Sequence, residues 1–289
     1  MKHTLFAAAL IAASASFLPS GVSAQSAPAL EFPQPSPAAA LKQRFGLTDV
    51  EVEYSRPGVK GRKIFGGLVP FGEVWRTGAN MATKVTFSTD VKLGGQPVPA
   101  GSYALVTIPG ATEWTVILSK VTGEWGTYAY DAKNDLLRVK VKPVVLAEPV
   151  ETFTIDVGDL RDVSASLILS WEKTRVSVKI ENDLVATLVP QIEAAMKAEG
   201  KKPYFQAAMF FYQHDLDLKR ALGWIDEAIK EKPDAVWMVY RRGLILEKSG
   251  DKAGALAAAN QALELARKAE GSLGAEYTRL SEAMIARLK

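Results

Sequence analysis

The spacing of apolar residues changes once along this chain of 289 residues, close to Glu181. Before that point apolar and polar residues alternate with a period of two, which is typical of strands that bury one face. Such runs begin at Val50, Val85, Tyr103, Trp114, Leu137, Phe153, Leu167 and Val176. Turn sequences such as Gly94-Gly95 and Glu172-Lys173 separate them. About nine short strands without intervening helices predict an antiparallel β-sandwich, with a small barrel as the alternative.

After Glu181 the apolar residues recur at helical spacing, beginning at Leu184. Dipeptides in this part then repeat at an offset of 34 residues: Ala221-Leu222 and Ala228-Ile229 return as Ala255-Leu256 and Ala262-Leu263. This period is typical of tetratricopeptide repeats, whose small residues let paired helices pack closely. Because two units rarely fold alone, the helix from Leu184 and a last helix over 275–288 are expected to cap the stack. The sequence thus predicts an α+β chain with segregated domains, a sandwich over 38–181 and a helical array over 182–289.

The N-terminus has the order of features found in an export signal. Lys2 and His3 precede a short apolar run over 5–13, and Val22-Ser23-Ala24 supplies the small residues that a signal peptidase requires. This predicts a cleaved signal peptide over 1–24, followed by a proline-rich linker over 25–37. No later stretch approaches the roughly 18 apolar residues of a membrane-spanning helix, so no membrane span is expected.

Composition excludes several classes of function. The 35 lysines and arginines nearly balance the 32 aspartates and glutamates, which argues against nucleic acid as a partner. There is no cysteine, and of the two histidines His3 lies in the predicted signal peptide. A cysteine nucleophile, a thiolate metal site and a multi-histidine zinc site are therefore excluded, and a serine triad could form only around His214. No cofactor or metal is expected.

The segment 55–80 is an unusually long connection that contains six glycines and five cations. Glycines let backbone N–H groups approach a ligand, and cations supply charge, so the segment is a candidate anion-binding loop. It lacks the Gly-Lys-Ser/Thr ending of a phosphate-binding Walker loop. The candidate ligand-binding residues are Arg56, Lys60, Arg62, Lys63, Trp75, Arg76 and Asn80. The alternative is structural: Trp75 plugs one end of the sandwich, and Arg56 or Arg76 pairs with a carboxylate.

The stretch from Ser36 to Asn80 resembles the signature of a secreted bacterial family, the domain of unknown function 2911. The runs 91–105 and 113–118 are also similar, so that the resemblance covers roughly 36–180. It implies no activity, and it suggests a Gram-negative host and hence a periplasmic location. Many relatives have an acidic residue after the Gly-Ala-Asn triplet, where this chain has Met81. The resemblance therefore implies no catalytic carboxylate at that position.

Aromatic residues after the middle of the sandwich offer a second candidate site. Trp125, Tyr128 and Tyr130 lie in a glycine-containing loop and could stack on sugar rings. Trp114 alternates with the core side of its strand and is expected to be buried.

Together these observations favour an exported, non-catalytic binding protein of the bacterial envelope. Its β-domain would hold a small anionic or glycan ligand or an envelope component, and its helical repeats would bind a protein partner. The alternative is a hydrolase of an envelope polymer that uses carboxylates such as Glu73, with Arg76 as electrostatic support. In a third interpretation the glycine-rich segment only stabilises the sandwich.

Overall fold

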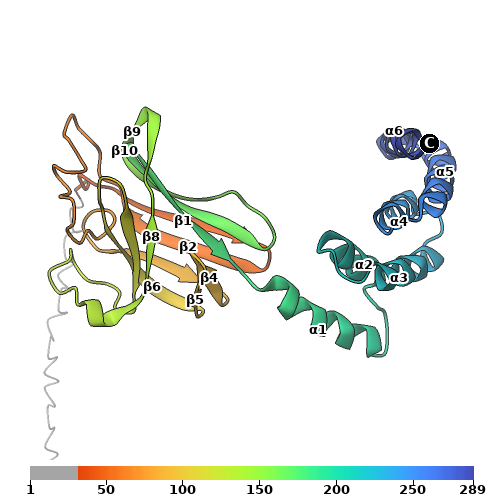
Figure 1. The fold of residues 1–289 in the computed structure, drawn as a ribbon, viewed down its shortest axis with the longest axis horizontal. Helices are drawn as coiled ribbons and strands as arrows, with labels where there is room; N and C mark the ends of the chain where they lie inside the picture. Colours follow the sequence, from red (N-terminus) through yellow and green to blue (C-terminus); the bar gives the residue numbers. More distant parts are fainter. Residues whose placement is uncertain (1–31) are drawn as a thin grey trace, which may run out of the picture. The chain divides into compact units, whose positions relative to one another are not determined.

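The computed structural model describes residues 32–289, so the predicted signal peptide and most of the predicted linker lie outside the described residues. Within that range there are ten strands and six α-helices. Figure 1 shows that the strands come first in the chain and the helices follow. A short 3-10 helix, η1 (Ala132–Asn134), lies among the strands. The predicted α+β class with segregated strands and helices is confirmed.

The strands form two antiparallel sheets. The larger sheet contains β1 (Ala38–Phe45), β2 (Thr48–Ser55), β3 (Thr83–Phe87), β6 (Gly101–Ile108), β7 (Trp114–Ser119) and β8 (Asp135–Val141). The smaller sheet contains β4 (Val91–Leu93), β5 (Gln96–Val98), β9 (Val144–Gly158) and β10 (Ser164–Glu181). Their orders are β1-β2-β3-β6-β7-β8 and β5-β4-β10-β9. Both sheets are open, so the sandwich is confirmed and the alternative of a closed barrel is wrong.

One hydrophobic core lies between the two sheets and takes residues from both. Val52, Val85 and Val116 of the larger sheet are fully buried, and Leu167 and Leu169 of the smaller sheet pack in the same cluster. This follows from the period of two, which directs alternate side chains of each strand to one face. Large aromatic rings complete the core, and Trp114 is buried as expected.

Four strands differ from the sequence prediction. The runs from Leu167 and from Val176 belong to one strand, β10, and the predicted turn at Glu172-Lys173 is wrong. Glu172 has a positive φ of 51°, and the register between β9 and β10 shifts there, so the strand is irregular but continuous. Such a bulge uses the same backbone conformation as a tight turn. Strands β1, β4 and β5 lie outside the predicted runs, because β1 begins with three alanines that give little alternation, and β4 and β5 are only three residues long.

The six helices are α1 (Leu184–Lys197), α2 (Tyr204–Gln213), α3 (Leu218–Glu231), α4 (Val236–Lys248), α5 (Lys252–Lys268) and α6 (Gly271–Leu288). Helices α3 and α5 begin 34 residues apart, in agreement with the repeat in the sequence. Each begins with an aspartate cap: Asp217 Oδ1 accepts from Lys219 N at 3.0 Å, and Asp251 Oδ1 accepts from Gly254 N at 2.8 Å. The assignment to tetratricopeptide repeats itself stays a prediction.

Small residues allow close contact between the helices. Ala221, Ala255 and Ala262 are fully buried. A Cβ atom added at Gly243 of α4 would lie 3.0 Å from Met284 Sδ of α6, so these helices approach where a side chain is missing. No helix within residues 32–289 has the length and apolar character that crossing a bilayer requires.

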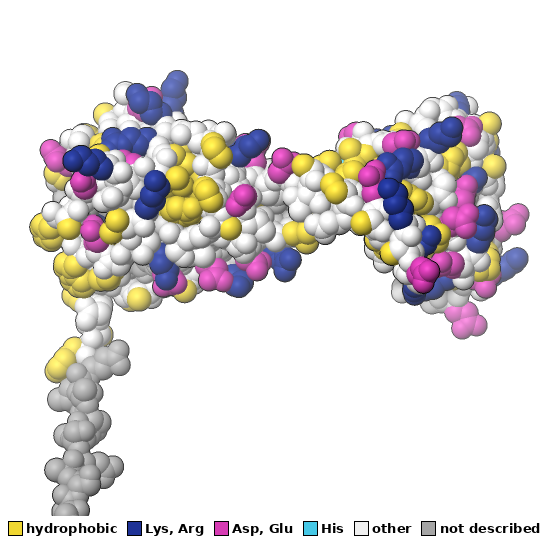
Figure 2. Space-filling view, turned by 90° about the horizontal axis from the view of Figure 1, so that it is seen from below, with side chains coloured by type: hydrophobic (Ala, Val, Ile, Leu, Met, Phe, Trp, Pro, Cys, Tyr) yellow, Lys and Arg dark blue, Asp and Glu magenta, His cyan; other side chains and the backbone are white. Residues whose placement is uncertain are grey.

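On the face shown in Figure 2, basic and acidic side chains are interspersed over the strand-rich part and over the helices. This pattern is what nearly equal numbers of basic and acidic residues lead one to expect.

Candidate functional site

The long loop between β2 and β3, residues 56–82, forms backbone bridges to both sheets. Gly58 forms an isolated bridge with Thr152 of β9, and Trp75 forms one with Thr107 of β6. In the latter, Trp75 N donates to Thr107 O at 2.7 Å and Thr107 N donates to Trp75 O at 2.9 Å. The loop therefore has a fixed course although it contains no helix.

Trp75 is the residue by which this loop enters the core. Its side chain is only 6% exposed, and its Nε1 donates to Gly78 O at 3.0 Å. The indole stacks on that of Trp171 from β10, with ring centroids 5.7 Å apart and planes 17° apart. Gly78 has a φ of 153°, and a Cβ there would lie 3.0 Å from Ser55 O, so this position requires glycine. Trp75 is thus part of the core, as the structural interpretation of this segment expected.

A cavity of about 340 Å³ lies between this loop and the core. Trp75 and Trp171 line it, and Leu68 and Val74 add further apolar surface. Its charged lining residues are Arg62, Glu73 and Arg76. A cavity of this size, lined by both polar and apolar groups, is suited to a small molecule.

Arg76 is the unusual residue of the cavity. Its Nε is buried, and within residues 32–289 it has no hydrogen-bond partner. No hydrogen bond or ion pair of its guanidinium involves a residue that the structure describes, so the expected alternative, pairing with a carboxylate, does not occur there. A buried charged nitrogen without a partner is destabilising, so an anion close to this guanidinium would be favourable.

Arg62 and Glu73 complete the polar part of the cavity. The Arg62 guanidinium is oriented by its own turn, because its Nε donates to Val59 O at 3.0 Å and its Nη2 to Gly58 O at 2.7 Å. Glu73 is exposed, and in the described part of the chain its carboxylate forms no ion pair. The cavity therefore holds one oriented cation, one unpaired cation and one unpaired anion.

A family model described as a protein of unknown function (DUF2911) matches residues 36–180. The chain belongs to this family. The match spans both sheets and the whole of the loop with its cavity, whereas the helices lie outside it. No curated protein and no solved structure matches this chain.

The remaining cations of this loop and the side chain of Asn80 do not line the cavity. Arg56 is bound to β9, with Nε donating to Phe153 O at 3.1 Å and Nη2 to Thr154 Oγ1 at 2.8 Å. The backbone N of Lys60 donates to Glu151 Oε1, and Lys63 is exposed outside the lining. Asn80 Nδ2 donates to Ser36 O and to Ser55 Oγ, both at 3.2 Å. The structure thus brings together Arg62, Glu73, Trp75 and Arg76 and places the other four elsewhere.

The sequence did not indicate that Trp171 lines the cavity. It lies on β10, 96 residues beyond Trp75 in the sequence. Its alternation with Leu167 and Leu169 indicated burial, but no local signal indicates that it meets Trp75. Contacts between residues so distant in sequence appear only in the folded chain.

The aromatic residues of the second candidate site separate into two groups. Trp125 is 62% exposed and Tyr128 is 92% exposed, so both can contact a ligand. Tyr130 is half-buried; its hydroxyl donates to Asp135 Oδ2 at 2.9 Å and accepts from Arg138 Nη2 at 2.9 Å. Burial, and then the neighbouring Asp135 carboxylate, raise the pKa of Tyr130. Tyr130 therefore braces the DUF2911 domain, and a stacking surface would consist of Trp125 and Tyr128.

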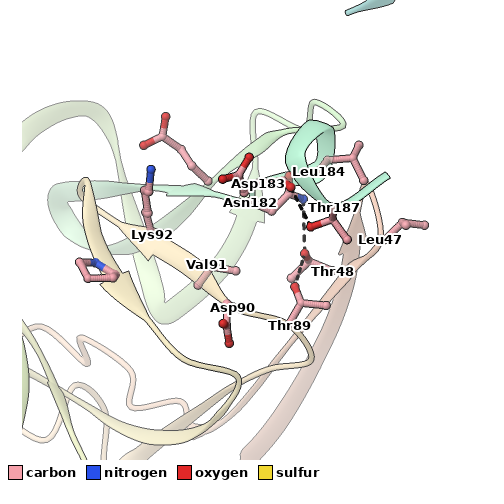
Figure 3. Close-up of a pocket in the computed structure, with 12 residues that line it drawn as sticks. Leu47, Thr48, Thr89, Asp90, Val91, Lys92, Asn182, Asp183, Leu184 and Thr187 are labelled. Atoms are coloured by element: carbon pink, nitrogen blue, oxygen red, sulfur yellow. Dashed lines mark hydrogen bonds between the residues drawn. The ribbon is translucent and has the colours of Figure 1, made fainter. Parts of the chain in front are cut away.

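A larger cavity, of about 460 Å³, lies near the start of α1 (Figure 3). Its polar groups bind one another: the hydroxyl oxygens of Thr48 and Thr89 are 2.7 Å apart, and Asn182 Nδ2 donates to Thr48 Oγ1 at 3.3 Å. Asp90 and two further acids outnumber the single lysine of its lining. This cavity is thus a poor site for an anion, in spite of its size.

A third cavity, of about 590 Å³, runs along the first residues of β1. Its charged lining residues, Glu53 and Lys84, pair with each other at 2.7 Å. Among residues 32–289 no three side chains of His, Cys, Asp or Glu gather in a way that could hold a metal ion. The cavity at Arg76 is therefore the best candidate for a ligand site.

Proposed function

We propose that this chain is a non-catalytic binding protein and that its DUF2911 domain binds a small anion in the cavity at Arg76. The observation that carries the proposal is the guanidinium of Arg76, whose buried Nε has no partner among residues 32–289. A guanidinium binds a carboxylate or a phosphate through two parallel hydrogen bonds, which are stronger than those between neutral groups. An anion in the cavity would therefore interact with the guanidinium of Arg76, and Arg62 would add a second cation.

Calorimetric titration of the chain without residues 1–24 tests this proposal. Acetate, longer monocarboxylates and inorganic phosphate serve as probes, at low and at high salt. We expect Arg76→Ala to weaken the binding of the preferred anion by about tenfold or more, because a charge-assisted hydrogen bond contributes roughly 1.5–3 kcal/mol. Lys63→Ala is the matched control, since it removes a cation of the same loop that lies outside the cavity. Equal affinity of the wild type and Arg76→Ala for every anion would reject the proposal.

The alternative of a hydrolase has less support in the geometry. Glycosidases generally use two carboxylates that flank the bond to be cleaved. Among the described residues that line this cavity, Glu73 is the one carboxylate. We therefore place Glu73 in binding and not in catalysis.

Export to the periplasm and a protein partner complete the proposal. The order of charge, apolar run and cleavage site over 1–24 supports export, which predicts Gln25 as the first residue of the protein isolated from its own cell. The period of 34 residues, shared by the sequence and by the starts of α3 and α5, supports a surface for a protein segment. Cross-linking of the exported chain to its neighbours in the cell tests this part of the proposal. Cross-links to proteins that involve only the DUF2911 domain, and none of the helices, would count against such a partner.

A further inference from the structure

Two unpaired groups of opposite charge share the cavity at Arg76. Glu73 and Arg76 are three residues apart in sequence and both line the cavity. Neither forms an ion pair with the other or with another residue that the structure describes. Opposite charges attract each other, and the attraction is weak where water surrounds one of the groups, as it does the exposed Glu73.

The backbone between Glu73 and Arg76 explains why they stay apart. On a helix, residues three apart would be neighbours on one face. Here Trp75 is inserted into the core and is bound to Thr107 of β6 by two backbone hydrogen bonds. Thr77, the residue after Arg76, has a positive φ of 56° and its hydroxyl donates to Thr107 Oγ1 at 3.0 Å. On the other side, Gly72 N donates to Pro109 O at 2.8 Å, so the backbone is fixed before Glu73 and after Arg76.

This arrangement indicates the charge of the ligand. A dianion such as phosphate would interact well with Arg62 and Arg76 but would be repelled by Glu73. A ligand that carries one carboxylate and one ammonium group would satisfy both unpaired groups at once. The apolar part of the lining, Leu68 and Val74 beside the two indoles, would remain for an apolar group of the same ligand.

We propose that the cavity binds a small α-amino acid with an apolar side chain, its carboxylate on Arg76 and its ammonium group on Glu73. This inference rests on the proposed anion site and specifies its ligand. The volume of about 340 Å³ is near the lower end of the range for small-molecule sites, which fits a ligand of this size.

Matched pairs of probes test the inference by calorimetry. Valine, leucine and phenylalanine are each compared with the same acid without its amino group, on the chain without residues 1–24. For at least one pair we expect the amino acid to bind about tenfold more tightly than its deaminated acid, as one added charge-assisted hydrogen bond would give. In Glu73→Gln this preference is expected to vanish, while the affinity for the deaminated acid stays within about twofold. Arg76→Ala is expected to weaken both.

The outcomes separate this inference from the function on which it rests. If the deaminated acids or phosphate bind in an Arg76-dependent way, and the amino group adds nothing, the anion site stands and the amino-acid ligand is rejected. If no probe binds, both fail. Glu148→Gln serves as the control for Glu73→Gln, because it makes the same change at an exposed position of β9 outside the cavity. A preference that vanished equally in Glu148→Gln would also overturn the assignment of Glu73.

Discussion

At the scale of single residues, Trp75 joins the core of the DUF2911 domain to its cavity. Its ring contacts those of Phe65, Trp114 and Phe153 at centroid distances between 5.1 and 6.4 Å, and it stacks on Trp171. The same ring lines the cavity. A substitution at Trp75 therefore changes stability and ligand binding together, whereas one at Arg76 can separate them.

Trp75→Ala is expected to lower the free energy of unfolding of the sandwich by about 3–5 kcal/mol, because a large buried ring leaves a cavity behind. Urea denaturation followed by circular dichroism measures this change. Trp125→Ala makes the same change at a ring that is 62% exposed, and its effect is expected within about 0.5 kcal/mol. Similar effects of the two substitutions would show that Trp75 is not a core residue.

The sequence indicated the loop that lines this cavity but could not rank the residues within it. Glycines and cations marked 55–80, and Arg62, Trp75 and Arg76 are among its candidates. Arg56 and Arg76 are equivalent by composition, yet Arg56 is bound to Phe153 and Thr154 of β9. These acceptors are almost a hundred residues away, so no local pattern could show which arginine remains unpaired.

At the scale of the elements, hydrophobic periodicity located most strands and helices because each buries one face. The prediction from periodicity was wrong where the backbone conformation is irregular. Glu172 adopts a positive φ inside β10, and its neighbours Lys173 and Thr174 are polar, which locally resembles a turn. Only pairing with β9 on both sides of Glu172 makes this a single strand.

An ion pair between α4 and α6 makes the stability of the helical array depend on pH. Arg287 Nε and Nη2 donate to Glu247 Oε1 and Oε2 at 2.7 and 2.6 Å. The hydrogen bonds from Arg287 lower the pKa of Glu247 below its usual value of 4.5, although partial burial opposes this. Since the folded state favours the charged form, the pair stabilises the array above about pH 4.5, and this stabilisation is lost as the pH falls through the lowered pKa.

Glu247→Gln is expected to reduce the free energy of unfolding by up to about 1 kcal/mol at pH 7, the usual range for a partly exposed pair. The difference from the wild type should shrink as the pH falls below about 4.5 and should be close to zero once Glu247 is protonated. Denaturation curves at several pH values measure it. Glu264→Gln on α5 is the control, since Glu264 is exposed and, in the described part of the chain, has no ion pair. A constant difference at all pH values would contradict the assignment.

At the scale of the whole molecule, the chain has separate hydrophobic cores. The core between the sheets uses residues from Ala39 to Ile180, and the clusters among the helices use residues from Val189 onward. No hydrophobic residue of the described chain belongs to both groups. The chain has no cysteine, so no disulfide links the two parts.

Separate cores predict two unfolding transitions. Leu167→Ala is expected to lower the melting temperature of one transition, and Ile245→Ala that of the other, because each side chain is fully buried in its own cluster. Differential scanning calorimetry with both variants checks this. A single transition that both substitutions shift would mean that the two parts unfold as one cooperative unit.

The stack of Trp75 on Trp171 also limits how this fold can evolve new ligand preferences. Because the floor of the cavity belongs to the core, mutations there lose several kcal/mol and are removed by selection for stability. Leu68 and Glu73 lie at the rim and are exposed, so substitutions at these two positions are nearly neutral for folding. Sequence divergence among descendants of this chain should therefore occur at the positions of Leu68 and Glu73, while Trp75 and Trp171 stay unchanged.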